Sequence, residues 1–293
     1  MAELSATAGG IMRKLLLGNI VLVALGAAGS ALAADMAVKT PVYKSPPPPV
    51  VVDNWTGFYV GLSVGGRWAD TTWTTVQLGG ANPIPPFGAP PNPQSFDSST
   101  ARVGGYLGYN WQLSPLWVVG VEADVAWGNS RSTVAGIPGT ACVPACVPFT
   151  GLDSSTVKEG WDASIRARVG ILVTPTTLLY ATGGAAWQRL EINASCFGNL
   201  GVAPSAWCVA VRNETVSWNK AGWTVGGGLE AMLWRNWLAR VEYRYADYRS
   251  VSHTFFVNSV DDQVAMTATL RTHTAWVGLA YKFGYASPVV ARY

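Results

Sequence analysis

The sequence has 293 residues and a formal net charge of +3, and only 13% of its residues are charged, about half the usual share in soluble proteins. It also contains 32 glycines, 14 tryptophans and 11 tyrosines, a composition that suits a surface in contact with lipid. After residue 34, however, no stretch approaches the roughly 18 consecutive apolar residues that a transmembrane helix needs. A helical membrane protein is therefore excluded.

The N-terminal residues are organised like a secretory signal. Arg13-Lys14 precedes an apolar run at 15–25, and Ala31-Leu32-Ala33 supplies the small residues of a cleavage site. An N-terminal membrane anchor is the alternative, but the apolar run is short and interrupted. We predict a signal peptide over residues 1–33 and Ala34 as the first residue of the mature chain.

The segment that follows the signal is rich in proline, with four consecutive prolines at 46–49. Such a stretch favours an extended polyproline conformation and cannot nucleate a core. We predict that residues 34–54 form a periplasmic linker ahead of the first strand. A docking ligand for a partner protein is the alternative.

An exported chain enters an oxidising compartment, in which its four cysteines can form disulfides. Cys142 and Cys146 lie in one segment rich in proline and glycine, and Cys196 and Cys208 lie in another. Two local disulfides, 142–146 and 196–208, are the simplest of the three possible connectivities. A four-cysteine zinc site is the alternative, but the spacings are not the C-x₂-C pairs typical of such sites.

From residue 55 onward, segments of alternating apolar and polar residues repeat along the chain, a pattern typical of β-strands with one apolar face. The segments lie near residues 58–65, 102–111, 117–127, 161–171, 177–190, 223–230, 237–245 and 274–283. An even number of such strands closes into an antiparallel barrel. We predict an all-β fold, an eight-stranded antiparallel up-and-down transmembrane β-barrel.

The connections between these segments alternate in length. Tight turns occur near residues 113–116, 174–176 and 234–237, and long segments rich in Pro, Gly, Ser and Thr occur near 70–98, 129–155, 192–214 and 250–267. This alternation predicts short periplasmic turns and four long extracellular loops. Aromatic residues near the strand ends suit the two interfacial girdles of a membrane barrel. A soluble sandwich or lipocalin-like barrel is the alternative.

The polar face of the strands carries most of the charges. An Arg or Lys at the bilayer midplane costs about 2–4 kcal/mol, so this face must line the lumen. The lumen of an eight-stranded barrel is just wide enough for side chains, so we predict that the charges pair and plug it, with an ion pathway as the alternative. The predicted lumenal charge network consists of Arg67, Arg102, Glu122, Asp124, Asp162, Arg166, Arg168, Glu230, Arg240, Glu242 and Arg244.

No motif predicts a catalytic, cofactor-binding or metal site. The run Gly61–Gly65 matches the G-x-S-x-G pattern of hydrolases, but it lies within a strand and not at a strand-to-helix turn. The run Gly226–Gly228 lacks the spacing of a phosphate loop and is better explained as room for bulky lumenal neighbours. His253 falls in the last predicted loop, where haem or metal binding is the alternative to a solvated side chain. We predict no enzyme activity and no cofactor.

Several motifs point to one protein family. They are Asn54–Gly61, Gly105–Asn110, Val119–Asp124, Tyr180–Ala186, Gly222–Glu230, Glu242–Tyr245 and His273–Phe283. Together they resemble the alphaproteobacterial porin-like outer-membrane proteins, also called outer-membrane immunogenic proteins. The resemblance covers about residues 54–284 and implies an OmpA-type barrel in the bacterial cell outer membrane, without a peptidoglycan-binding domain. Relatives usually end at the strand-closing aromatic residue, whereas this chain continues past Phe283.

These patterns divide the chain into a signal peptide (1–33), a periplasmic linker (34–54), an outer-membrane β-barrel (55–284) and a C-terminal extension (285–293). We expect a structural surface barrel that maintains envelope integrity, with a small diffusion channel or a loop-mediated adhesin or haem binder as the alternatives. The expected partners are outer-membrane lipid and lipopolysaccharide and the barrel-assembly machinery, and a homo-oligomer is a further option. Without its signal the chain has a net charge of about +2, which predicts no nucleic-acid partner.

Overall fold

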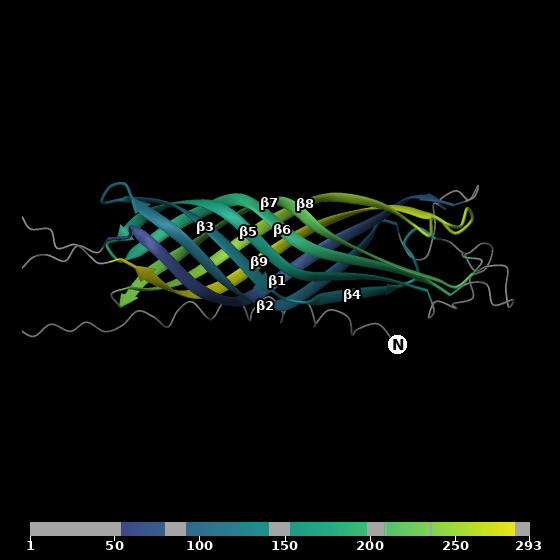
Figure 1. The fold of residues 1–293 in the computed structure, drawn as a ribbon, viewed down its shortest axis with the longest axis horizontal. Coiled ribbons are helices and arrows are strands. Elements are labelled where there is room, and N and C mark those ends of the chain that lie inside the picture. The colour runs from purple at the N-terminus through teal and green to yellow at the C-terminus, as the bar shows by residue number, and fades with distance from the viewer. Residues whose placement is uncertain are drawn as a thin grey trace, which may run out of the picture. The chain divides into compact units, whose positions relative to one another are not determined.

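The structure, a computed structural model, describes residues 54–79, 92–140, 153–197, 208, 210–234 and 236–284 (Figure 1). The strands in these ranges are β1 (Gly57–Leu78), β2 (Gln94–Gln112), β3 (Trp117–Trp127), β4 (Ser130–Ala135), β5 (Ser154–Thr174), β6 (Thr177–Cys196), β7 (Arg212–Trp234), β8 (Trp237–Phe255) and β9 (Val264–Phe283). No helix in the described ranges is long and apolar enough to cross a membrane. The predicted signal peptide, most of the linker, the C-terminal extension, Cys142 and Cys146 lie outside the described residues.

Antiparallel pairing between neighbouring strands closes the sheet into a ring. β1 pairs with both β2 and β9, and β3 and β4 both pair with β5. Because β3 and β4 follow one another along the same part of the wall, the nine segments form a barrel of eight strands. The predicted eight-stranded up-and-down barrel is confirmed.

The wall is interrupted at Gly128 and Asn129, between β3 and β4. β2 pairs with β3 up to the Val103–Trp127 pair, and beyond it the only partner of β4 among the described strands is β5. The carbonyl of Gly128 accepts a hydrogen bond from Arg67 Nη2 at 2.5 Å, and the carbonyl of Asn129 accepts one from Thr100 Oγ1 at 3.0 Å. Carbonyls that leave the strand ladder here are thus satisfied by side chains, as buried backbone groups require.

The outer surface of the barrel changes from apolar to polar along the strands. The outward residues of β1 are apolar or glycine from Phe58 to Trp68, and Asp70 begins a polar stretch. Ten residues of strand rise about 33 Å, or about 25 Å along the axis of a barrel whose strands tilt by about 40°. This height matches the apolar band of a membrane barrel, and we call this zone the belt. Exposed aromatic side chains mark both its margins, at Phe58, Trp111, Trp117, Trp237 and Phe283 on one side and at Trp68, Trp127 and Trp223 on the other.

The interior shows the opposite change. Inside the belt the lumen is charged, whereas beyond the belt, toward the end with the long connections (the loop end), it is filled by an apolar core. In that core Trp73 stacks on Phe255 and Phe96, with ring centroids 5.5 and 6.2 Å apart. A second apolar cluster closes the end with the tight turns (the turn end) and contains Trp55, Val118, Leu172, Leu178, Leu238 and Ala280.

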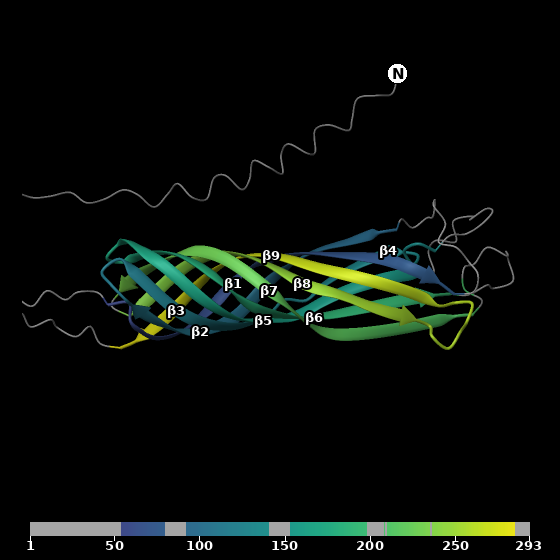
Figure 2. The ribbon, with the colours of Figure 1, turned by 90° about the horizontal axis from the view of Figure 1, so that it is seen from above.

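The strands run well past the belt toward the loop end (Figure 2), and the bounds predicted for the long loops were therefore wrong. The strands that are not interrupted have 19–23 residues, about twice what a tilted strand needs to span a bilayer. β1 reaches Leu78 and β9 begins at Val264, both within segments predicted as loops. The outward residues of these extensions are mostly Thr, Ser and Asn, and their inward residues build the apolar core of the loop end, so the apolar face here points inward and not toward lipid.

Candidate functional site

The predicted charge network lies in the lumen of the belt. Its residues come from six strands and are each at most 9% exposed. Period-two spacing places several of them on one face of a single strand, as with Arg240, Glu242 and Arg244 on β8. The other members are Arg67 on β1, Arg102 on β2, Glu122 and Asp124 on β3, Asp162, Arg166 and Arg168 on β5, and Glu230 on β7.

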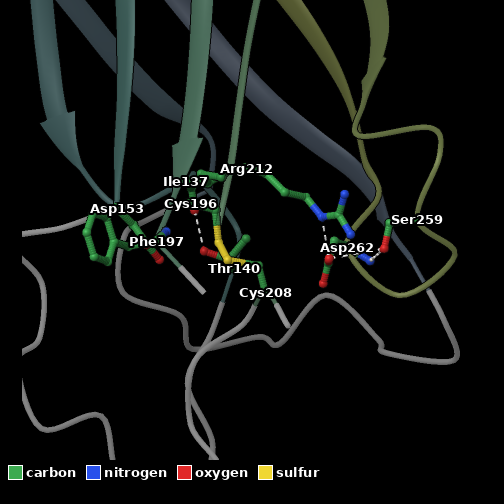
Figure 3. Close-up of a disulfide and its surroundings, with 9 residues drawn as sticks. All are labelled: Ile137, Thr140, Asp153, Cys196, Phe197, Cys208, Arg212, Ser259 and Asp262. Atoms are coloured by element: carbon green, nitrogen blue, oxygen red, sulfur yellow. Dashed lines mark hydrogen bonds and ion pairs between the residues drawn. A yellow bond between two sulfur atoms is a disulfide. The ribbon is translucent and has the colours of Figure 1, made fainter. Parts of the chain in front are cut away.

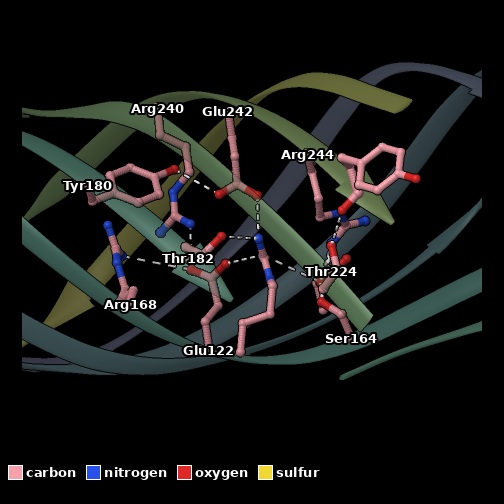
Figure 4. A network of polar contacts seen from close by, with 12 residues as sticks. Glu122, Ser164, Arg168, Tyr180, Thr182, Thr224, Arg240, Glu242 and Arg244 are labelled. Atoms are coloured by element: carbon pink, nitrogen blue, oxygen red, sulfur yellow. Dashed lines mark hydrogen bonds and ion pairs between the residues drawn. The ribbon is translucent and has the colours of Figure 1, made fainter. Parts of the chain in front are cut away.

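Glu122 is the centre of the network (Figure 4). Its carboxylate accepts hydrogen bonds from Arg166 Nη2 at 2.6 Å, from Arg240 Nη1 at 2.5 Å and from the Tyr59 hydroxyl at 2.7 Å. A third guanidinium, that of Arg168, lies 3.8 Å away. One carboxylate from β3 thus joins side chains of β1, β5 and β8 across the lumen.

On the turn-end side of Glu122, two arginines share a second carboxylate and rest on aromatic rings. Arg168 Nη2 and Arg240 Nη2 each lie 2.9 Å from Glu230 Oε2. The Arg168 guanidinium lies 4.2 Å from the centroid of the Tyr180 ring, and that of Arg240 lies 4.2 Å from the centroid of Tyr106. The rings add cation–π attraction in a site without bulk water.

On the loop-end side, two aspartates hold three arginines. Asp124 accepts hydrogen bonds from Arg102 at 2.6 Å and from Arg244 at 2.8 Å. Asp162 accepts hydrogen bonds from the same two arginines, at 2.7 and 3.2 Å, and from Arg67 at 3.1 Å. These shared contacts bind β1, β2, β3, β5 and β8 together at this level.

Arg166 links the two halves of the network. Besides Glu122, it contacts Asp124 at 3.5 Å, and its Nη1 donates to Glu242 Oε1 and to Thr182 Oγ1. The other oxygen of Glu242 accepts a hydrogen bond from the Tyr180 hydroxyl at 2.9 Å. A buried charge is tolerated only when it is paired and hydrogen-bonded, and this arrangement meets that condition.

Sequence reasoning missed a sixth lumenal acid, Glu159. It is 1% exposed and accepts hydrogen bonds from the hydroxyls of Ser98 at 2.9 Å, Thr71 at 3.3 Å and Ser130. A bulge between Glu159 and Asp162 shifts the phase of β5, so that an odd-numbered and an even-numbered residue both face the lumen. With Glu159 the six lumenal arginines face six carboxylates.

Sequence reasoning also gave no role to the lumenal tyrosines. A Cβ at Gly228 would lie 2.8 Å from the Tyr180 hydroxyl, and one at Gly61 would lie 2.5 Å from Cζ of Tyr106. The glycines on the polar faces therefore leave room for these rings, as the sequence suggested for Gly226–Gly228. One signal in the sequence could have revealed these lumenal rings. Each tyrosine lies on the polar face of its strand, and the neighbouring strand is rich in glycine.

Near the loop end, Cys196 at the end of β6 forms a disulfide with Cys208, with their Cα atoms 6.4 Å apart (Figure 3). The predicted 196–208 disulfide is confirmed, and the predicted 142–146 pair lies outside the described residues. Asp153 lies beside the two sulfurs and accepts a hydrogen bond from the Phe197 amide at 2.7 Å. Metal binding by cysteine requires a thiolate, so these three residues do not form a metal site while the disulfide is intact.

The prediction that His253 lies in a loop was wrong, because the residue belongs to β8. Its Nε2 lies 2.9 Å from Glu214 Oε1 on β7, and its ring packs edge-on against Phe255 with the centroids 4.8 Å apart. The other histidine, His273, lies in β9, with its Nδ1 2.6 Å from the hydroxyl of Tyr243. Both imidazoles thus bridge neighbouring strands.

Comparisons with known proteins identify a family and several relatives of this chain. A family model described as "Outer membrane protein beta-barrel domain" matches residues 20–283. The chain is 31% identical over 278 residues to a 31 kDa outer-membrane immunogenic protein of Brucella melitensis biotype 1, covering 90% of this chain and 99% of that one. It is 31% identical over 185 residues to a 22 kDa outer membrane protein of Rhizobium leguminosarum, covering 61% and 66% of the two chains. The crystal structure of OprG from Pseudomonas aeruginosa is similar at 12% identity and a TM-score of 0.49, over 79% of this chain and 98% of that one.

The family model covers most of the chain, and the Brucella relative matches over nearly its whole length. The resemblance seen in the sequence is thereby confirmed. The chain belongs to the outer-membrane β-barrel family that includes the immunogenic proteins of Brucella, and it is a protein of the bacterial outer membrane.

Proposed function

We propose that this protein is a structural surface barrel with a closed lumen, which strengthens the outer membrane without conducting ions. The observation that carries the proposal is that three layers of side chains follow one another along the axis of the lumen. The apolar cluster around Trp55 lies at the turn end, the Arg–carboxylate network lies in the belt, and the apolar core around Trp73 lies at the loop end. An ion that crossed the lumen would have to displace side chains of all three layers.

The alternative of a small diffusion channel requires charges that attract ions in transit. Here each acid of the network accepts hydrogen bonds from buried arginines. Glu122, for example, accepts them from both Arg166 and Arg240. An entering cation would compete with guanidinium groups already in contact, at distances where the interaction is strong in a site without water. The same engagement argues against catalysis, because these carboxylates are not free to transfer a proton to a substrate. We therefore also propose that the protein is not an enzyme.

Single-channel recording in planar bilayers tests the closed lumen. Refolded protein whose insertion is verified by heat-dependent electrophoretic mobility should give no steady current at either polarity. Steady, reproducible conductance steps from verified barrels would contradict the proposal and favour the diffusion channel.

The structural role requires a test in cells. A strain that lacks the protein should take up apolar dyes faster and resist detergents less well than its parent. Complementation with the intact gene should restore both properties. An unchanged envelope in the deletion strain would refute the structural role without bearing on whether the lumen is closed.

A further inference from the structure

A group of basic residues occupies the outer surface of three neighbouring strands just beyond the belt. Arg131 on β4, Lys158 on β5 and Arg189 on β6 are all exposed, and we call them the basic patch. Two of them are placed by tryptophans at the loop-end margin of the belt. Arg131 follows Trp127 by four residues, and Arg189 follows Trp187 by two.

The basic patch brings like charges together at a cost. Arg131 and Lys158 are direct cross-strand partners, and like charges in that relation destabilise a sheet. The stem of Arg189 lies across β5 above Gly160, where an added Cβ would lie 3.4 Å from its Cδ. Among the described residues, the one ion pair of the patch joins Lys158 to Glu191 at 2.7 Å. Three cations therefore converge on β5 with one carboxylate between them.

The adjoining part of the wall, on β1 and β2, has the reverse charge just beyond the belt. Asp70, two residues beyond Trp68, is the cross-strand partner of Asp97, and both are exposed. The nearby Arg271 is already paired with Asp247 at 3.2 Å. Lys220 on β7 and the exposed Arg249 on β8 carry further positive charge beyond the belt. The basic patch is therefore one segment of a positive surface that the acidic pair on β1 and β2 interrupts.

We propose that the basic patch binds the phosphate groups of lipopolysaccharide in the outer leaflet. Long loops face the cell exterior in barrels of this type, so the patch lies at the outer surface of the bilayer. Residues a few positions beyond the tryptophan girdle lie at the height of the lipid headgroups. Arginine and lysine are the side chains that hold phosphates, and a shared anion would offset the repulsion between Arg131 and Lys158. The inference rests on the outer-membrane location and does not require a closed lumen.

The test is an equilibrium titration of the full-length mature protein, in phosphatidylcholine nanodiscs, with phosphorylated lipid A. A basic residue near an anionic surface contributes about fivefold in affinity, so replacing Arg131 and Arg189 together with glutamine should weaken binding by about 25-fold. A matched double replacement of Arg212 and Arg271 with glutamine removes the same charge from residues already paired with Asp262 and Asp247. That control should bind within about twofold of the unmodified protein.

A second variant, Gly160→Leu, keeps every charge and fills the space beneath Arg189. It should weaken lipid A binding by about fivefold, which separates the arrangement of the patch from its net charge. For the unmodified protein, lipid A stripped of its phosphates should bind far more weakly than the phosphorylated form. High salt should weaken binding of the phosphorylated form, because exposed charges are screened.

Several results would overturn the proposal. They are equal binding by the unmodified protein and the Arg131/Arg189 variant, equal binding of the two forms of lipid A, and an equal loss in the Arg212/Arg271 control. Competition by inorganic phosphate at the same concentration as lipid A would assign the patch to free anions. Sedimentation that shows loss of self-association in the Arg131/Arg189 variant, with lipid binding intact, would instead assign the basic patch to contact with Asp70 and Asp97 of a second copy.

Discussion

Replacing Glu242 with alanine removes a carboxylate that two buried groups share. Arg166 Nη1 and the Tyr180 hydroxyl both donate to it, and Glu242 is 1% exposed. The change leaves a guanidinium with fewer acceptors and a buried hydroxyl without this partner. We expect the barrel to lose stability while keeping its strand pairing.

The magnitude follows from the contacts that remain. Breaking a buried ion pair by removing one partner costs about 3–5 kcal/mol, and Arg166 keeps Glu122 at 2.6 Å and Asp124 at 3.5 Å, which favours the lower figure. The unpaired Tyr180 hydroxyl adds about 1 kcal/mol. We therefore expect Glu242→Ala to lower the free energy of unfolding by about 4 kcal/mol. Glu242→Gln, which keeps an acceptor oxygen, should lose about half as much.

Urea unfolding in lipid vesicles, followed by tryptophan fluorescence, measures the change. The matched control is Asp261→Ala, an exposed acid near the start of β9, which should alter stability by less than about 0.5 kcal/mol. If Glu242→Ala proved as stable as Asp261→Ala, the argument that the network contributes to stability would fail. The apolar clusters at both ends are untouched, so Glu242→Ala should still give no steady current in planar bilayers.

Three further predictions concern other parts of the barrel. Leu62→Arg places a charge on the lipid side of the belt and should cost about 2–4 kcal/mol in vesicle unfolding. Ser95→Arg, at an exposed position opposite Thr72 and beyond the belt, should cost less than about 0.5 kcal/mol, and equal costs would contradict the assigned belt. Trp73→Ala opens a cavity in the loop-end core and should cost about 3–5 kcal/mol. Backbone amides of β1 and β8 beyond the belt should then exchange hydrogen faster, whereas those inside the belt keep their protection. Uniform loss of protection would show that the loop-end core and the belt unfold together. Replacing Cys196 and Cys208 with serine removes a cross-link across 12 positions that contributes about 3 kcal/mol through chain entropy, and the barrel should still fold without it. Peptide mapping of the intact protein under non-reducing conditions should find Cys196 joined to Cys208, and a disulfide from either to a cysteine of another loop would refute this connectivity.

The sequence by itself determined the strand content, the barrel and the side of the wall on which the charges lie. Period-two alternation assigns a face to each residue wherever one face meets lipid, because a charge in the bilayer is so costly. Arg166, Arg168, Arg240 and Arg244 could therefore be placed in the lumen from spacing alone, and the local 196–208 disulfide followed from proximity in the chain.

Only the tertiary structure decided which charges meet and where the strands end. Contacts such as Glu122 with Arg240 join strands far apart in the sequence, and they depend on the stagger of the barrel, which no local pattern contains. Glu159 was missed because a bulge shifted the alternation on which its placement depended. The strand extensions were missed because, beyond the belt, water replaces lipid as the outer solvent, so the barrel turns polar residues outward and apolar residues inward.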